Sequence, residues 1–307
     1  MTAPVQTDDV VIARAPAKIN LHLGVGPVRA DGYHELATVF CALSLTDELV
    51  AAEGSGVSIV TAGEGADAVP ADASNLACRA ALRLAEHAGI DADVEMSVRK
   101  QIPVAAGLAG GSAGAAAAPG ACDALWGTGA SRGDLLQIAA ELGSDVAFSL
   151  TGGLALGTGR GEMLSPVLAA GRWHWVLAVA EGGLSTGDVY RELDRIREGT
   201  ERGATLELPD ALMNALRSRD TDALGAALHN DMEPAAFGLM PTLRRTKAAG
   251  VEEGAAGALL CGSGPTMAFL ARDEQHAVDL AARVSGLGVC RTVRTAYGPV
   301  PGARITG

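Results

Sequence analysis

The chain has 307 residues, enough for one large domain or two of ordinary size. Hydrophobic residues make up 48% and charged residues 20%, which excludes a wholly disordered chain and supplies material for a packed core. The net charge of −12 argues against a nucleic-acid-binding protein, which normally has a basic face, but a local cluster of donors could still hold an anionic small molecule.

The cysteines favour buried, reduced thiols over a zinc site or a disulfide framework, because they are odd in number, widely spaced and never form C-x-x-C. They are Cys41, Cys78, Cys122, Cys261 and Cys290. The N-terminal residues contain no basic segment followed by an apolar run, and no uninterrupted apolar stretch of about 18 residues follows. These features predict a soluble, cytoplasmic protein that spans no membrane.

The first elements in chain order are strands. Residues 10–25 alternate in the manner of paired strands that Pro16 interrupts, and residues 29–45 form a turn at Asp31-Gly32 followed by a β-rich run. A helix is expected from Ser74, capped by its hydroxyl, to Gly89. In residues 92–103, Val94, Met96 and Val98 alternate with Glu95, Ser97 and Arg99, which predicts a strand with one exposed face in an antiparallel sheet.

A glycine-rich run and a second set of helices follow. The segment 115–126 has a helical composition, but an interior proline costs about 3 kcal/mol. We therefore expect this helix to be kinked or broken near Pro119, with a new turn from about Ala121. Another capped helix is predicted from Ser131 to Gly143, and residues 152–164 resemble a glycine-rich hairpin.

The second half starts with a predicted strand at 173–180. Strands and helices alternate without a strict βαβ rhythm, which predicts an α+β fold of two domains, residues 1–165 and 166–307. Helices are expected around 186–198, 209–218, 221–229, 239–249 and 274–284, with strands within 257–271 and 288–297.

The glycine-rich stretch at 103–113 lies between an alternating strand and an apolar helix, unlike a flexible linker. Exposed N–H groups and the positive end of a helix dipole would make it an anion site, with Ser112 offering a hydroxyl to a phosphate or to Mg²⁺. No lysine follows the glycines and G-x-G-x-x-G is not matched, so neither a Walker loop nor a Rossmann turn is present. A phosphate cradle is favoured, and plain close packing stays open.

Three stretches in this order resemble the GHMP kinase superfamily: residues 15–25 (APAKINLHLGV) with 29–36 (RADGYHEL), 103–113 (PVAAGLAGGSA) and 260–266 (LCGSGPT). The Lys-x-Asn and Asp-Gly-Tyr-His pair is similar to members that act on a diphosphocytidyl sugar alcohol in non-mevalonate isoprenoid synthesis. The resemblance implies a two-domain α+β GHMP kinase fold with the active site in the interdomain cleft.

The same resemblance implies an ATP- and Mg²⁺-dependent kinase that phosphorylates the 2-hydroxyl of that sugar alcohol. Its partners would be this small molecule and ATP, with no nucleic acid and no membrane, and it would be a monomer or a weak homodimer. Two alternatives stay open: a GHMP kinase for another alcohol, such as homoserine or mevalonate, and a catalytically weakened nucleotide-binding protein.

The resemblance also implies roles for individual residues. Lys18 and Asp145 match the catalytic pair, with Asp145 as general base and Lys18 keeping it ionised and stabilising developing charge. The matched ATP-binding positions are Pro103, Val104, Ala105, Ala106, Gly107, Leu108, Ala109, Gly110, Gly111, Ser112 and Ala113, with Asn75 and Leu76 near adenine. The matched substrate-binding positions are Asn20, Tyr33, His34, Tyr190, Gly262, Ser263 and Gly264.

Three departures from the family pattern concern the ATP site. Gly114 replaces an Asp or Asn, Ala147 replaces a proline, and Pro119 with Gly120 interrupts the helix after the glycine loop. They leave the catalytic pair and the loop glycines in place, but they threaten the rigidity of the helix that would face the phosphates.

Overall fold

The larger of two sheets is built on two long antiparallel strands, β1 (Val11–Val28) and β2 (His34–Ala52). The structure is a computed structural model that describes residues 10–198, 206–207 and 209–306. Beyond β2 lie β4 (Val94–Lys100) and β3 (Val57–Gly63), and the hairpin of β5 (Leu154–Thr158) and β6 (Met163–Pro166) pairs with the first half of β2. Along β1 lie β12 (Arg304–Ile305) and the parallel β8 (His229–Asn230). Two strands from the second half of the chain, β8 and β12, therefore belong to the larger sheet.

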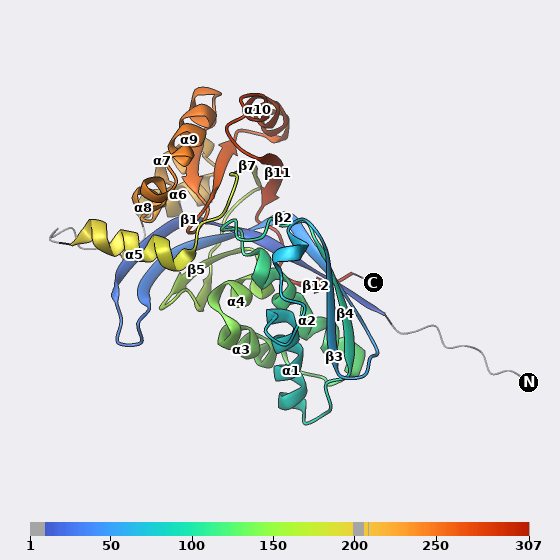
Figure 1. Cartoon of the computed structure of the whole chain (residues 1–307). Coiled ribbons are helices and arrows are strands. Elements are labelled where there is room, and N and C mark those ends of the chain that lie inside the picture. Colours follow the sequence, from blue (N-terminus) through green and yellow to red (C-terminus); the bar gives the residue numbers. More distant parts are fainter. Residues whose placement is uncertain (1–9, 199–205, 208, 307) are drawn as a thin grey trace, which may run out of the picture.

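Four helices cover one face of this sheet (Figure 1): α1 (Leu76–Ala88), α2 (Gly110–Trp126), α3 (Arg132–Leu142) and α4 (Ser144–Thr151). A short 3₁₀ helix, η1 (Ala66–Ala68), follows β3. Helix α2 lies in the middle and contacts β1, β2, α1 and α4. Its buried alanines let these elements approach closely, and they form much of a core that holds few aromatic rings.

The smaller sheet has the order β11 (Thr292–Gly298), β7 (Trp173–Val179), β10 (Thr266–Ala271) and β9 (Gly257–Leu260), with all pairs antiparallel. One face packs with α9 (Thr242–Glu252) and α10 (Glu274–Gly286), and the other with α6 (Asp210–Ser218) and α7 (Thr221–Ala227). Helices α5 (Thr186–Arg197) and α8 (Glu233–Leu239) contact each other beside it. This mixture of helices with sheets whose pairs are mostly antiparallel confirms the α+β expectation, although β3–β4 and β1–β8 are parallel. The division at residues 165 and 166 stays a prediction.

Several local signals are confirmed. Gly89 ends α1 in the left-handed conformation, Ser131 forms a capping box with Asp134 at the start of α3, and β4 alternates buried and exposed residues as expected. The cap of α1 is wrong by one residue: Asn75 accepts the backbone N–H of Ala77, while the Ser74 hydroxyl bonds to a neighbouring aspartate. Strand β3, helices α4 and α8, and the short β8 were not anticipated.

Two expectations about proline are wrong. β1 is not interrupted at Pro16, because the register shifts between Pro16 and Ala17, and such a bulge tolerates a residue without an N–H donor. Helix α2 runs continuously from Gly110 to Trp126 through Pro119, so the expected break and the new start at Ala121 are wrong, while a kink at Pro119 stays a prediction. Pro119 is itself buried in this central helix, and tertiary packing on the sheet and on neighbouring helices holds the helix together despite the lost backbone bond.

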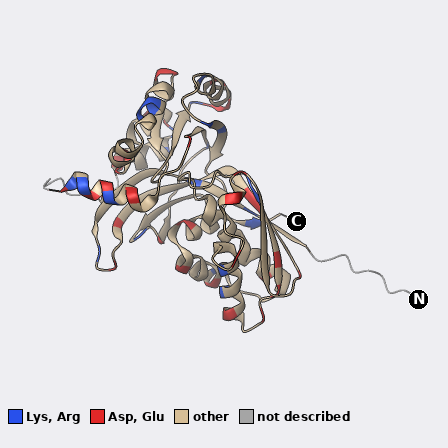
Figure 2. Ribbon diagram, in the orientation of Figure 1, with Lys and Arg blue, Asp and Glu red and all other residues tan. Residues whose placement is uncertain are grey.

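The cysteine expectation is confirmed, since all five thiols are free and only Cys290 is less than fully buried. Within the described part of the chain, no helix has the length and apolar character needed to cross a membrane. Figure 2 shows acidic and basic residues side by side along α5, where ion pairs such as Arg195–Glu192 link successive turns.

Candidate active site

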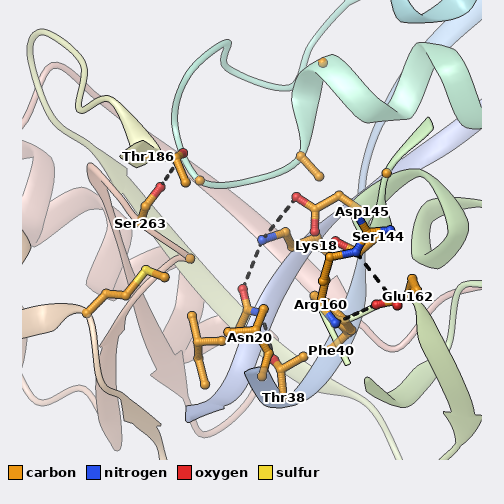
Figure 3. Close-up of a pocket in the computed structure, with 18 of the residues that line it drawn as sticks. Lys18, Asn20, Thr38, Phe40, Ser144, Asp145, Arg160, Glu162, Thr186 and Ser263 are labelled. Atoms are coloured by element: carbon orange, nitrogen blue, oxygen red, sulfur yellow. Dashed lines mark hydrogen bonds and ion pairs between the residues drawn. The ribbon is translucent and has the colours of Figure 1, made fainter. Parts of the chain in front are cut away.

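A pocket of about 760 Å³ lies where the two sheets meet, and all three motif regions contribute to it (Figure 3). Its walls come from β1, β2, the glycine loop, the start of α4, the β5–β6 turn, the start of α5 and the turn between β9 and β10. The predicted residues that line it are Lys18, Asn20, Tyr33, Ala105, Ala106, Gly107, Ala109, Gly110, Gly111, Asp145, Tyr190, Gly262, Ser263 and Gly264. The other predicted residues, which include His34, Asn75, Leu76 and Ser112, do not line this pocket.

Lys18 and Asp145 form an ion pair in the pocket, with 3.6 Å between Nζ and Oδ2. Lys18 lies on β1 and its side chain is 6% exposed, whereas Asp145, in the first turn of α4, is 36% exposed. The ammonium is therefore buried beside a more accessible carboxylate, which stays open to a ligand.

A hydrogen-bond chain on β1 and β2 fixes the lysine. Lys18 Nζ donates to Asn20 Oδ1 at 3.0 Å, Asn20 Nδ2 donates to Thr38 Oγ1 at 2.8 Å, and the Thr38 hydroxyl donates to the His22 carbonyl at 2.7 Å. The four residues linked by these hydrogen bonds are all buried. Because both ends of Asn20 are engaged, its amide orientation is determined and the ammonium is held toward Asp145 (Figure 3).

The glycine loop has the backbone of an anion site. Ala105, Gly107 and Ala109 all have left-handed φ angles, at 53°, 75° and 62°. Left-handed residues in a turn orient successive N–H groups into a concave surface that attracts anions, and non-glycine residues seldom adopt them outside functional loops. The loop leads into α2 at Gly110, where the first N–H groups have no intrahelical acceptor.

Three sets of contacts tether this loop. The buried Asp47 accepts the N–H groups of Gln101 and Ile102 at 2.8 and 2.9 Å, and the buried Lys100 ammonium bonds to both Asp47 and the Gly110 carbonyl. The Lys18 N–H donates to the Leu108 carbonyl at 3.1 Å. The middle of the loop lies so close to the 261–264 turn that a Cβ on Gly107 would be 1.9 Å from the Cys261 carbonyl oxygen.

The predicted adenine residues have structural uses in this conformation. Asn75 caps α1 through Oδ1 and donates from Nδ2 to the Pro70 carbonyl at 2.7 Å. Ser112 lies in the first turn of α2, directly after the loop glycines, and does not line the pocket. Their contacts with ATP stay predictions.

The three ring-bearing residues among the predicted substrate-binding positions form one stacked pair and one separate ring. The rings of His34 and Tyr190 stack on each other, with centroids 4.7 Å apart, and His34 Nε2 bonds to Asp194 at 2.9 Å. Burial, and then the nearby Asp145 carboxylate, raise the pKa of Tyr190 above its usual range, so its phenol stays protonated. Tyr33 is 57% exposed and has the Arg160 guanidinium 5.0 Å above its ring. A base could therefore stack on Tyr33 without separating His34 from Tyr190.

Several pocket residues were missed from the sequence. Arg160 and Glu162 lie on the β5–β6 turn, Thr186 starts α5, and Phe40 lies on β2. The Thr186 hydroxyl is 2.9 Å from that of Ser263, which joins α5 to the 262–264 turn. The one local signal was Arg160 between Gly159 and Gly161, with Glu162 directly after them; the remaining contacts depend on long-range pairing.

Two family models match the chain: GHMP kinases N terminal domain over residues 75–153 and GHMP kinases C terminal over residues 212–289. A 4-diphosphocytidyl-2-C-methyl-D-erythritol kinase of Salinispora arenicola is 56% identical over 293 residues, which cover 95% of this chain and 93% of the relative.

Solved structures of kinases have the same fold as this chain. The crystal structure of a 4-(cytidine 5'-diphospho)-2C-methyl-D-erythritol kinase has a TM-score of 0.76 and 33% identity, covering 93% of this chain and 98% of that one. A homoserine kinase from Cytophaga hutchinsonii has a TM-score of 0.75 over the whole of both chains, but at 20% identity it shares only the fold.

Proposed function

The chain belongs to the GHMP kinase family, and from this we propose that it uses ATP to phosphorylate the 2-hydroxyl of 4-diphosphocytidyl-2-C-methyl-D-erythritol, a step in non-mevalonate isoprenoid precursor biosynthesis. The observation that supports it most is the juxtaposition of the Lys18–Asp145 pair with the glycine loop in one pocket, in a chain 56% identical to a kinase of that name. Phosphoryl transfer requires a positioned acceptor hydroxyl, a proton acceptor and neutralisation of the phosphate charge. The pocket supplies the carboxylate of Asp145 as the proton acceptor and the ammonium of Lys18 as positive charge, and the acceptor molecule would bring the hydroxyl.

We assign the proton-accepting role to Asp145. An acceptor hydroxyl bonded to its carboxylate would lose its proton to Oδ1 or Oδ2 as the oxygen attacks the γ-phosphorus of ATP. Lys18, held by Asn20, stays paired with Asp145 and close enough to stabilise negative charge on the transferring group. The ADP oxygen leaves on the opposite side of the phosphorus.

ATP would lie along the glycine loop, with backbone N–H groups around residues 105–111 holding its phosphates. Mg²⁺ accepts oxygen ligands and usually binds through one or two protein groups together with nucleotide phosphates. The protein groups that would hold such an ion are the Asp145 carboxylate on the pocket wall and the Ser112 hydroxyl, which lies in the first turn of α2 outside the pocket lining. When bound, it would supply positive charge to the β- and γ-phosphates.

We further propose that residues 1–165 and 166–307 are the two domains of the enzyme, and that it works in the cytoplasm as a monomer or weak homodimer. Homoserine and mevalonate kinases share this fold, so the choice of acceptor depends on the walls near Tyr33 and Tyr190.

The test is an ADP-release assay with the diphosphocytidyl substrate, homoserine and mevalonate as separate acceptors. We expect turnover with the first alone, and a loss of roughly 100- to 10,000-fold in kcat for Asp145→Asn. Asp279→Asn, which changes an exposed carboxylate on α10, is the matched control and should keep full activity. Full turnover in Asp145→Asn would exclude the general-base assignment, and ATP binding without turnover on any acceptor would favour a nucleotide-binding protein.

A further inference from the structure

The β5–β6 turn holds one arginine at a fixed place on the pocket wall. The Gly159 N–H donates to Glu35 Oε1 at 3.1 Å, and the Leu36 N–H donates to the Gly159 carbonyl at 2.7 Å, which joins the turn to the start of β2. The Arg160 N–H donates to Glu162 Oε2 at 2.6 Å. The backbone at Arg160 is thereby fixed from both sides.

Glycine makes this packing possible. Gly159 and Gly161 have left-handed φ angles of 71° and 97°. A Cβ on Gly161 would be 3.4 Å from the Cβ of Ser144 and 3.5 Å from the Phe40 ring, so the turn lies directly against the start of α4. Ser144 is next to Asp145, and Arg160 is therefore close to the candidate catalytic residue as well as to Tyr33.

The guanidinium of Arg160 has N–H donors without an acceptor among the described residues. Its closest acidic neighbour is Glu162, at 3.9 Å between Nε and Oε1, and within the described residues its N–H groups make no hydrogen bond. An arginine has five such donors in a planar fork that matches phosphate oxygens. Lys18 is the other cation on the pocket wall, and it is already engaged by Asn20 and Asp145.

The layout of the substrate suggests what Arg160 binds, on the premise of the proposed function. A diphosphocytidyl sugar alcohol has a reacting hydroxyl at one end, a cytosine at the other and a diphosphate between them. With the hydroxyl at Asp145 and the base against Tyr33, the diphosphate passes the segment that joins these two places. We propose that Arg160 binds the diphosphate of the sugar-alcohol substrate and so selects acceptors that have one.

Two other ligands for Arg160 fit less well. The phosphates of ATP have their own donors in the glycine loop and the start of α2. Cytosine has no net charge, and the guanidinium already covers one face of Tyr33, so a base would use the other face or stack on the guanidinium itself. A dianionic diphosphate gains most from a cation with free donors.

The test compares the affinities of CDP, cytidine and a non-hydrolysable ATP analogue by titration calorimetry. The variants are Arg160→Ala and Arg160→Lys, with Arg172→Ala as control because Arg172 is exposed and lies 4.1 Å above the ring of Tyr297, outside the pocket. We expect Arg160→Ala to weaken CDP binding roughly 10- to 100-fold, the effect of a hydrogen bond to a charged group. Cytidine and the ATP analogue should change less than twofold, and Arg160→Lys should keep part of the CDP affinity.

Kinetics supply a second measurement. KM for the diphosphocytidyl substrate should rise in Arg160→Ala while KM for ATP stays constant, and added salt should weaken CDP binding less in this variant than in the original chain. Equal CDP affinity in both proteins would overturn the proposal, as would equal losses for CDP and cytidine, which would assign Arg160 to the base. Loss of the ATP analogue alone would assign it to ATP. If the unaltered chain binds neither CDP nor cytidine, the proposed substrate itself is wrong.

Discussion

Gly107→Ala tests whether contact between the glycine loop and the 261–264 turn sets the geometry of the ATP site. Gly107 has a φ of +75°, and an alanine Cβ there would be 1.9 Å from the Cys261 carbonyl oxygen and 3.1 Å from the Gly264 nitrogen. Opening the first contact to 3.0 Å, below which real Cβ contacts essentially never occur, requires the loop and the turn to separate by about 1 Å. The left-handed backbone costs an alanine a further 1–2 kcal/mol or so.

A shift of this size affects function more than folding. Displacement of a positioning group by about 1 Å can cost roughly 100-fold in rate. We therefore expect kcat/KM for ATP to fall about 100-fold in Gly107→Ala, with a loss of about 2 kcal/mol in the free energy of unfolding. Steady-state kinetics at varied ATP and urea denaturation measure the two effects.

Gly114→Ala is the matched control, because it adds the same methyl group two turns further along. Its Cβ would be 3.9 Å from the Ala77 Cβ, an ordinary contact, and the residue is inside α2. Alanine is favoured over glycine in a helix by about 0.5–1 kcal/mol, so this variant should be as active and slightly more stable. If Gly107→Ala keeps ATP kinetics within threefold of the original chain, the contact with the turn does not set the loop geometry.

Two further predictions concern buried charge. Lys100→Met should lower the free energy of unfolding by about 3 kcal/mol, which is the low end for breaking a buried ion pair. The loss stays at the low end because Asp47 keeps two backbone N–H donors. A loss below about 1 kcal/mol in urea denaturation would contradict this prediction. Burial, and then the neighbouring His229, lower the pKa of His22 to about 4, and among the described residues its ring nitrogens have no partner. The unfolded chain binds a proton on His22 below about pH 6.5, and the folded chain binds it only near pH 4. The contribution of His22 to the free energy of unfolding is therefore fully present above pH 6.5 and falls by roughly 2–3 kcal/mol toward pH 4. His22→Leu should flatten this part of the profile, and an unchanged slope in denaturation at pH 4.5 and 7 would refute it.

Features with a local cause could be predicted from the sequence. The capping box at Ser131 and the terminating Gly89 involve residues within one helical turn, and the alternation in β4 follows from one buried face. Asn75 and Ser74 are both good N-terminal caps, so composition could not decide which one starts the helix.

The features that could not be predicted from the sequence depend on contacts between segments that are distant along the chain. The cost of Pro119 is local, but the packing that offsets it involves α1 and the sheet. The Lys100–Asp47 pair joins residues 53 positions apart, and Arg160 meets Tyr33 only because β5 pairs with β2. Among candidate site residues, a motif match named Lys18 and Asp145, but it could not show that Asn20 and Thr38 fix the lysine.

The position of Lys18 also explains why three motifs so far apart must occur in one chain. Residues of β1 as far as Leu21 belong to one hydrophobic core, which also includes one face of the smaller sheet, whereas Leu23 and Val25 belong to a second core with residues of β7 and β10. The 262–264 turn of the smaller sheet lies against the lysine, since a Cβ on Gly262 would be 3.1 Å from Nζ. The ammonium is thus positioned by β1 and by a turn of the smaller sheet, and the backbone bond from the Lys18 N–H to the Leu108 carbonyl sets its distance from the glycine loop. Substitutions that shift the smaller sheet should therefore alter the ATP site even where they contact no ligand.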